Sequence, residues 1–420
     1  MVTRHLIVTG ANGYIGGRLV TAARARGHTV TVLTRRTGAT STEVRALLWT
    51  LGNPLPLGAL AAEVPIERHT LIHLAHDWTE ATPGPGEGAL NVAGTRTLLE
   101  ACRALKLGRF VFVSSQSART DATNVYGRVK WRIEQMLAGD CEVAARVGLV
   151  YGGPRQGLYG LLSKLTARLP VLPMIDPSRP VQPIHVDEVC EGLLQLAEGA
   201  AAPDGWVGLA GPEGVPFGDV LRAYARELHG KRLRVLPIPL RLALFACDVL
   251  GRLPAGPKPD RERVLGLAGT RPMPCAGHLA AIGITVAPLA MGLRREAASR
   301  RALLAEGRLL LRYVLLGPPS TALLRRYVRA LPAIGEAGAL SLNRLARVWP
   351  SLLRLLEPIG PEPFLGRRLA LALALVEASP EGEQALAHMG RAARIAGLIG
   401  GLTVDALLLP ARMLRARLRR

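Results

Sequence analysis

Three glycines that separate a run of aliphatic residues from a helical pattern constrain the fold of this chain most. Residues 6–17 read LIVTGANGYIGG, with glycines at positions 10, 13 and 16. The apolar residues at positions 6–8 indicate a buried strand. The first glycine permits a tight turn, the second lets the backbone approach a pyrophosphate, and the third lets the helix pack closely on the strand. Free N–H groups at the helix start favour phosphates. The spacing therefore predicts a dinucleotide site.

Short apolar runs alternate with helical patterns after this motif. Strands are expected at residues 28–34, 47–51, 70–75 and 109–115, and helices at residues 13–26 and 89–105. Such a rhythm indicates parallel strands joined by helical crossovers. The predicted fold class is therefore α/β, with a doubly wound parallel sheet of the Rossmann kind.

The end of the second expected strand bears on the choice of cofactor. A carboxylate at this position would hydrogen-bond the ribose of NAD, whereas here Thr34 is followed by Arg35 and Arg36. Two guanidinium groups suit the extra phosphate of NADP. We therefore predict NADP as the cofactor, with NAD as the alternative.

Polar side chains after the strand at 109–115 carry the predicted chemistry. Ser114 and Ser115 end this strand, at the edge where open α/β sheets bind ligands. Tyr126 and Lys130 follow four positions apart, so one helical turn places them on one face. A nearby ammonium group lowers a Tyr pKa toward the range of a general acid or base. The alternative is a solvent-facing Tyr and Lys on an amphipathic helix. Only five residues of the chain are Lys, against 48 Arg, which favours the catalytic interpretation.

An ordered set of motifs resembles the extended short-chain dehydrogenases/reductases of the NAD-dependent epimerase/dehydratase group. The matching stretches are TGANGYIG from Thr9, HLA from His73, NVAGT from Asn91, FVFVSS from Phe110, YGRVK from Tyr126, RVGLVYG from Arg146 and IHVDEV from Ile184. The resemblance covers residues 1–298. It implies that Tyr126 donates and accepts the proton, that Lys130 holds the nicotinamide ribose and lowers the Tyr126 pKa, and that Ser115 hydrogen-bonds the reacting oxygen. Ser114 and Ser117 are alternatives for the last role.

The predicted cofactor contacts gather at the glycine-rich turn, at two strand ends and on the helix that carries Tyr126. They are Gly10, Gly13, Tyr14, Ile15, Gly16, Arg35, Arg36, Leu74, Ala75 and Lys130.

The chain also departs from the pattern of the group it resembles. Tyr126 follows Ser115 by only 11 positions, whereas sugar-nucleotide epimerases of the group usually carry a longer insertion there. Val147 stands where the group usually has proline, and residues 48–52 lack the usual aspartate near the adenine. The short segment weakens the case for a sugar-nucleotide substrate.

Composition argues against several other functions. The net charge is +21, but 48 of the 53 basic residues are Arg, as a GC-rich coding bias produces, and aromatic residues are only 4% of the chain. Without basic runs interleaved with aromatics, no nucleic-acid partner is expected. The five cysteines form no CxxC pair and His73 has no second ligand at metal spacing, so no metal site is expected. The start of the chain runs directly into a strand, and we expect a cytoplasmic protein.

Three domains are expected: an NADP-binding domain at 1–150, a substrate lobe at 151–298 and a helical extension at 299–420. Glycine and proline after Tyr151 suggest a loop-rich substrate lid, with Tyr151, Arg155 and Gln182 as candidate pocket residues. Asp187 is expected to cap a helix at 188–196, and His185 to pack between the two lobes rather than act in catalysis.

Beyond about residue 300 we expect five or six short helices. Residues 301–420 carry 18 Arg and 8 acidic residues, which makes this part more basic per residue than the rest. The apolar run at 395–404, with Arg412, Arg415 and Arg419 at helical spacing, suits peripheral contact with an anionic membrane on its cytoplasmic face. The interpretation we favour, however, is an accessory bundle that packs on the enzyme or forms a homo-oligomer, with membrane contact as the alternative.

The function predicted from the sequence is an NAD(P)-dependent oxidoreductase or epimerase. It transfers a hydride between nicotinamide and a carbinol or ketone carbon of a small molecule. Ser115, Tyr126 and Lys130 transfer the proton and orient the reacting oxygen. The alternative is a non-catalytic NAD(P)-binding scaffold. The presence of Tyr126 and Lys130 argues against a scaffold, which needs neither a phenol nor a titratable amine.

Overall fold

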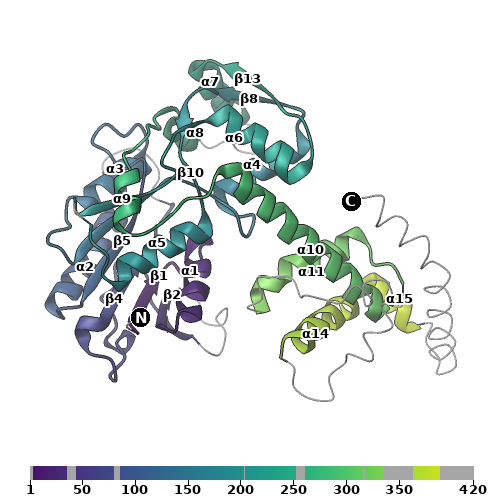
Figure 1. Ribbon diagram of the computed structural model, residues 1–420, viewed down its shortest axis with the longest axis horizontal. Helices are drawn as coiled ribbons and strands as arrows, with labels where there is room; N and C mark the ends of the chain where they lie inside the picture. Colours follow the sequence, from purple (N-terminus) through teal and green to yellow (C-terminus); the bar gives the residue numbers. More distant parts are fainter. Residues whose placement is uncertain are drawn as a thin grey trace. The chain divides into compact units, whose positions relative to one another are not determined.

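The computed structural model describes residues 3–35, 44–79, 86–202, 204–251, 261–315, 317–334 and 363–387. The chain forms two compact units, Met1–Glu296 and Ala297–Arg420 (Figure 1). The elements that position the candidate site lie in the first unit. The finer three-part division expected from the sequence stays a prediction.

The first unit is built on a sheet of seven strands, and its parallel pairing agrees with the prediction from the sequence. Its order is β11-β6-β5-β4-β1-β2-β3. The strands are β1 (His5–Thr9), β2 (Thr29–Thr34), β3 (Arg45–Leu48), β4 (His69–His73), β5 (Arg109–Ser115), β6 (Glu142–Val147) and β11 (Trp206–Leu209). The order reverses direction at β1, between β2 and β4, and in doubly wound folds such a reversal opens the ligand crevice. The Rossmann fold class is confirmed.

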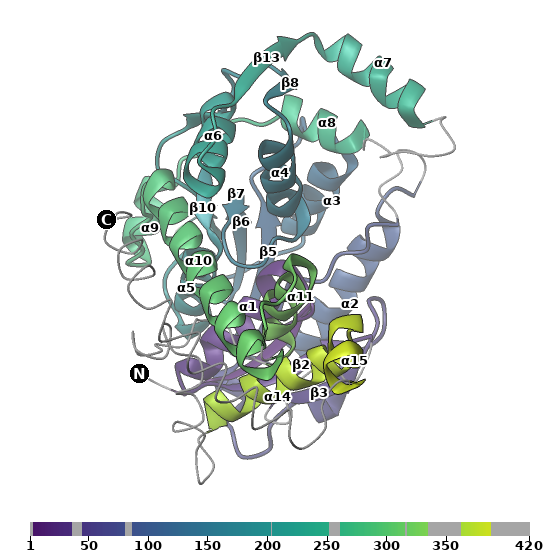
Figure 2. The ribbon, with the colours of Figure 1, turned by 90° about the vertical axis from the view of Figure 1, so that its right-hand side faces the viewer.

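Helices cover both faces of the sheet (Figures 1 and 2). On one face, α1 (Tyr14–Ala25) packs against α5 (Val186–Glu198), and their apolar side chains share a core with β1, β2 and β6. On the other face, α2 (Ala89–Ala104) and α3 (Val125–Glu134) form a second core with β4 and β5. The apolar strands are buried on both sides, which explains their continuous hydrophobic runs.

The start of α5 differs from the expected one. Its N-cap is His185, not Asp187: the His185 Nδ1 accepts the Asp187 N–H at 3.2 Å, and Glu188 Oε2 accepts the His185 N–H at 3.0 Å. This reciprocal pair is a capping box. The prediction failed because histidine is an uncommon cap, whereas aspartate is a preferred one.

The segment after Tyr151 is more ordered than a loop-rich lid. A helix and a strand, α4 (Gly157–Arg168) and β8 (Val171–Ile175), fill most of it, and β8 pairs in parallel with β13 (Arg234–Ile238). The remaining elements are η1 (Leu57–Ala59), η2 (Ile66–Arg68), β7 (Leu149–Tyr151), β9 (Pro180–Val181), β10 (Pro183–His185), β12 (Val215–Pro216), α6 (Phe217–Ala223), η3 (Tyr224–Leu228), α7 (Leu240–Gly251), α8 (Arg261–Ala268) and α9 (Ala276–Ala281). The expected lid is thus largely regular structure, because its prolines lie at the ends and edges of strands.

The described part of the C-terminal region is helical, as expected, but it does not consist only of short helices. It contains α10 (Leu289–Leu315), which has 27 residues, together with α11 (Thr321–Ala330), η4 (Leu331–Ile334), α14 (Pro363–Glu377) and α15 (Pro380–Ala387). In its core, Arg368 and Tyr327 both donate to Glu306 Oε1, at 2.5 and 2.7 Å. Such a buried charge is tolerated because it is paired.

The residues behind the membrane-contact prediction, 395–404 and the arginines at 412, 415 and 419, lie outside the described part of the chain. Among the helices that the structure describes, none is both long and apolar enough to cross a membrane.

Replacing Gly16 should destabilise the fold, and replacing its neighbour Gly17 should not. A Cβ at Gly16 would overlap the Gly10 carbonyl oxygen, while one at Gly17 would lie 3.5 Å from the Ala11 oxygen, an ordinary contact. We expect Gly16→Ala to lower the free energy of unfolding by about 1–3 kcal/mol. Gly17→Ala should raise it slightly, since alanine favours a helix. Urea unfolding measures both, and equal stability of the two variants would contradict the packing argument.

Candidate functional site

The glycine-rich turn brings the start of α1 close to the end of β4. Gly10 has a φ of +67°, and a Cβ there would lie 2.8 Å from the Ala75 nitrogen. The Gly13 N–H donates to the Gly10 carbonyl at 2.9 Å and closes the turn. Thr9, at the end of β1, accepts both the Leu74 and the Ala75 N–H at 3.1 Å. Only glycine fits at position 10, so the turn and the β4 end form one compact edge.

The start of α1 suits a pyrophosphate. Its N-cap is Gly13, which has no side chain to satisfy the first helical N–H groups, and its first turn contains no acidic residue. Those N–H groups and the positive end of the helix dipole favour an anion. At the end of β2, Asn12 Nδ2 donates to Thr34 Oγ1 at 2.8 Å, and Arg35 is exposed beyond it. Arg36 lies outside the described residues.

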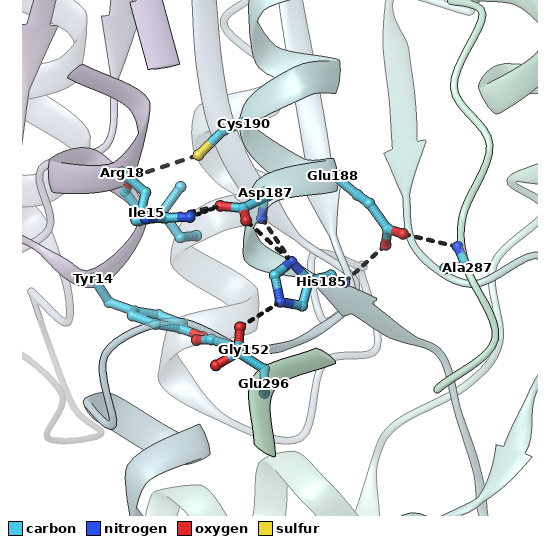
Figure 3. A network of polar contacts seen from close by, with 10 residues as sticks. All are labelled: Tyr14, Ile15, Arg18, Gly152, His185, Asp187, Glu188, Cys190, Ala287 and Glu296. Carbon is cyan, nitrogen blue, oxygen red and sulfur yellow. Dashed lines mark hydrogen bonds and ion pairs between the residues drawn. The ribbon is translucent and has the colours of Figure 1, made fainter. Parts of the chain in front are cut away.

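Two of the predicted cofactor residues are anchored elsewhere by their own contacts (Figure 3). The Tyr14 hydroxyl donates to the Gly152 carbonyl at 2.5 Å, and the Ile15 carbonyl accepts the Cys190 thiol at 3.9 Å. The Tyr14 side chain also packs in two apolar cores, one shared with α5 and one with α4 and α6. These are contacts of the side chain, and the cofactor contact expected at Tyr14 and Ile15 stays a prediction.

A polar network lies beside the Tyr14–Gly152 contact and includes His185. Its Nε2 lies 3.0 Å from Glu296 Oε1, and Asp187 in turn accepts from Arg18 Nε at 2.9 Å (Figure 3). The expected packing of His185 at a junction fits these contacts, because they tie α1, α5 and the first turns of α10 together.

The three serines at the end of β5 have different partners. Ser114 is buried and donates to Glu134 Oε1 at 2.5 Å, within a group where Arg146 pairs with the same carboxylate. Ser115 shares a hydrogen bond with Ser117, with 2.8 Å between the Oγ atoms, and it is near enough to Tyr126 to lower the pKa of the phenol, against the effect of burial. Ser115 is therefore the serine beside Tyr126, while Ser114 is held in a structural ion-pair network.

Tyr126 and Lys130 lie on the same face of α3, as the spacing predicted. The Lys130 Nζ lies 5.7 Å from the centroid of the Tyr126 ring and donates to the Val113 carbonyl at 2.8 Å. Burial lowers the pKa of Lys130 to about 7, an effect that Glu134 opposes. Burial raises the pKa of Tyr126 to about 12, and Ser115 opposes this effect. The expected lowering of the Tyr126 pKa is therefore wrong for this structure, because desolvation outweighs any effect of the cation.

Two residues that sequence reasoning missed surround Tyr126. The Trp78 ring stacks on the Tyr126 ring at 5.1 Å between centroids and 15° between planes, and 63% of Trp78 is exposed. His76 meets the Tyr126 ring edge-on at 5.0 Å. The signal was available: β4 and β5 are neighbours in the sheet, so the residues that follow β4 lie beside those that follow β5.

His73 has a structural environment, in line with the sequence interpretation. Its Nδ1 lies 2.7 Å from Thr9 Oγ1, and its Nε2 lies 3.1 Å from Thr95 Oγ1. Burial and the nearby Lys130 lower the pKa of both His73 and His76 to about 3, so both imidazoles are neutral. Among the residues that the structure describes, no group of three or more His, Cys, Asp and Glu is placed to hold a metal ion.

The candidate pocket residues of the lobe fall into two kinds. Gln182 is buried, and its amide nitrogen donates to the Gly211 and Met273 carbonyls at 2.9 and 3.0 Å. Tyr151 is buried in the lobe core, while Arg155 is exposed. Gln182 therefore joins segments of the lobe and is not available to a substrate, contrary to the expectation.

The neutral histidines should make stability depend on pH. Because the folded pKa of His76 is about 3 and the unfolded value is 6.5, the unfolded state binds more protons between these pH values. Stability is therefore lost as pH falls from 6.5 toward 3, by up to about 1.4 kcal/mol per pH unit for each such histidine. We expect His76→Gln to show a shallower loss than the wild type in urea unfolding at pH 7.5, 6 and 5. Parallel pH dependences for the two proteins would contradict the burial argument.

Comparisons with known proteins identify the family of the chain. A sequence model of the NAD dependent epimerase/dehydratase family matches residues 6–142. A ceramide reductase of Caulobacter vibrioides is 30% identical over 241 residues, which cover 55% of this chain and 73% of that protein. A dTDP-4-dehydrorhamnose reductase of Mycolicibacterium smegmatis is 22% identical over 48% of this chain and 63% of the relative.

Solved structures share the fold. A UDP-glucose 4-epimerase of Thermotoga maritima superposes with a TM-score of 0.52 and 17% identity, over 71% of this chain and 99% of that one. A human epimerase family protein, solved with NADPH, has a TM-score of 0.52 and 18% identity over 70% and 99%. The motifs, the sheet order and these relatives lead to one conclusion: the chain belongs to the NAD-dependent epimerase/dehydratase family of extended short-chain dehydrogenases/reductases, enzymes that work with a nicotinamide cofactor.

Proposed function

We propose that this protein is an NADP-dependent oxidoreductase that reduces a ketone of a small molecule to a carbinol. The observation that carries the proposal is the grouping of Ser115, Tyr126 and Lys130 at the carboxyl end of β5, which only β4 separates from β1 and its glycine-rich turn. A non-catalytic scaffold would have no use for a buried amine beside a phenol.

Different residues of the first unit bind the cofactor and act on the substrate. The turn at Gly10–Gly16 and the start of α1 hold the pyrophosphate, and Lys130 holds the nicotinamide ribose. Reduced nicotinamide supplies the hydride. Ser115 hydrogen-bonds the substrate oxygen, and the Tyr126 hydroxyl donates the proton to that oxygen as the carbon accepts the hydride.

The pKa of Tyr126 favours the reductive direction. A pKa of about 12 keeps the phenol protonated at neutral pH, as a proton donor must be. An enzyme that mainly oxidises a carbinol needs the phenolate at the start of the reaction, and burial disfavours that form here. The relatives named as reductases agree with this direction.

Trp78 indicates the kind of substrate. Its exposed indole stacks on Tyr126 and gives the approach to the phenol an apolar wall. The segment from Ser115 to Tyr126 is short and is held to residues 262–269, with the Thr123 hydroxyl donating to the Leu265 carbonyl at 2.8 Å. We therefore propose a ketone with an apolar body rather than a nucleotide-linked sugar.

Tyr126→Phe tests the proposed reaction. We expect turnover to fall at least about a hundredfold, as for the loss of a general acid, with the Kd for NADPH nearly unchanged. The assay follows NADPH oxidation with a panel of ketones, and fluorescence titration gives the Kd. An active Phe variant would remove Tyr126 from the mechanism, and a wild type that binds NADPH but reduces no ketone would favour the scaffold.

Arg35 and Arg36 test the choice of cofactor. Replacing both by serine removes two cations at the end of β2, and we expect binding of NADPH to weaken by about 1–3 kcal/mol. Binding of NADH should hardly change, because it lacks the phosphate. Titration of both proteins with both nucleotides measures the difference. A wild type that already prefers NADH would show that the interpretation of this strand end is wrong.

A further inference from the structure

One end of the substrate lobe exposes apolar side chains on three neighbouring elements. The strands β8 and β13 pair in parallel, with Val171 opposite Arg234 and Pro173 opposite Leu236. Side chains alternate between the two faces of a strand. Leu172 and Val235 are buried in the lobe core, so their neighbours face outward, and Val171 and Leu236 are 38% and 52% exposed.

The helix that follows β13 continues this surface. In α7, Ala243 and Cys247 are buried, whereas Leu242 and Phe245 are 52% and 64% exposed. These two are three positions apart and thus lie on one face of the helix. Because α7 contacts β8, and α7, β8 and β13 lie at the same end of the lobe in both views (Figures 1 and 2), they form one continuous area. We call Val171, Leu236, Leu242 and Phe245, with the cations around them, the lobe-end surface.

The charge of the lobe-end surface has one sign. Residues 161–175 and 230–247 contain six basic and no acidic residues. These cations are Lys164, Arg168, Lys231, Arg232, Arg234 and Arg241, and all six are exposed. Acids just beyond these segments are already paired: Asp176 with Arg179 and Asp248 with Arg261.

We propose that the lobe-end surface docks on an anionic lipid bilayer. Leu242, Phe245 and Leu236 enter the interfacial region, and the surrounding Arg and Lys side chains contact lipid phosphates. Exposed apolar side chains mixed with cations match the two layers of such an interface, apolar acyl chains and negatively charged headgroups. A second copy of this chain would instead bring six more cations against the same face, which like charges disfavour. This proposal uses none of the basic C-terminal residues and does not depend on the proposed reaction.

Vesicle flotation of the full chain tests the docking. We expect the wild type to float with vesicles of phosphatidylglycerol and phosphatidylcholine, in a salt-sensitive manner, and not with phosphatidylcholine alone. Leu242→Glu with Phe245→Glu should reduce the partition coefficient about tenfold or more. Arg234→Gln with Arg241→Gln should reduce it about fivefold for each cation removed.

A matched control separates this surface from a general effect of added charge. Leu48, at the end of β3, is 65% exposed, close to the 64% of Phe245, so Leu48→Glu is the matched control for the single variant Phe245→Glu, which adds the same one negative charge at a similar exposure. Leu48→Glu should float like the wild type, and thermal unfolding checks that every variant is folded.

Phe245→Trp gives a readout confined to the surface. We expect brominated lipids to quench the added fluorescence, relative to the wild type, only with anionic vesicles. Three results would overturn the proposal: no binding of the wild type at low salt, binding that the Leu242/Phe245 double variant retains in full, or flotation without quenching of the added Trp. Light scattering tests the other occupant of the surface. A wild type that is dimeric, together with a double variant that is monomeric, would also overturn the proposal and would assign the surface to a second copy of the chain.

Discussion

The close approach of Gly10 to the end of β4 is the constraint on which the site depends. No side chain fits between the turn and the Leu74–Ala75 backbone, and Thr9 joins them by accepting both N–H groups. The Thr9 hydroxyl also lies 2.7 Å from His73, which reaches Thr95 on α2. One buried chain of hydrogen bonds thus links β1, β4 and α2, and fixes the start of α1 relative to the strand ends where chemistry can occur.

Parallel topology then determines which side chains meet. Since β4 and β5 are adjacent, the residues after β4 lie beside the helix that follows β5, and this places Trp78 and His76 against Tyr126. Lys130 comes from the next turn of that helix, and its amine donates to β5 itself. The site is therefore assembled from three crossovers of one sheet, which explains why residues far apart in the chain share it.

The sequence predicted the parts that follow from local patterns. The limits of β5 agree with the expected range, and Tyr126 and Lys130 share a face of α3 because helical spacing alone requires it. The predicted sheet also contained the neighbourhood of Trp78 and Tyr126, because the residues after β4 lie beside those after β5. The His185 cap and the regular structure after Tyr151 depend on contacts between distant segments, which periodicity does not contain. The pKa of Tyr126 was misjudged for the same reason: the nearby cation could be seen in the sequence, whereas the degree of burial could not.

Burial moves both groups of the proposed acid pair toward their neutral forms, and this has a consequence for the reaction. Desolvation disfavours the phenolate of Tyr126 and the ammonium of Lys130 separately, but it does so less when the two charges form together. If Tyr126 gives its proton to a substrate oxygen as we propose, the developing phenolate would raise the proton affinity of the amine, which lies 5.7 Å from its ring. In the proposed reaction, the attraction between the two groups would therefore be weak in the ground state and would grow as the phenolate forms. An interaction that grows along the reaction would lower the barrier more than it stabilises the ground state.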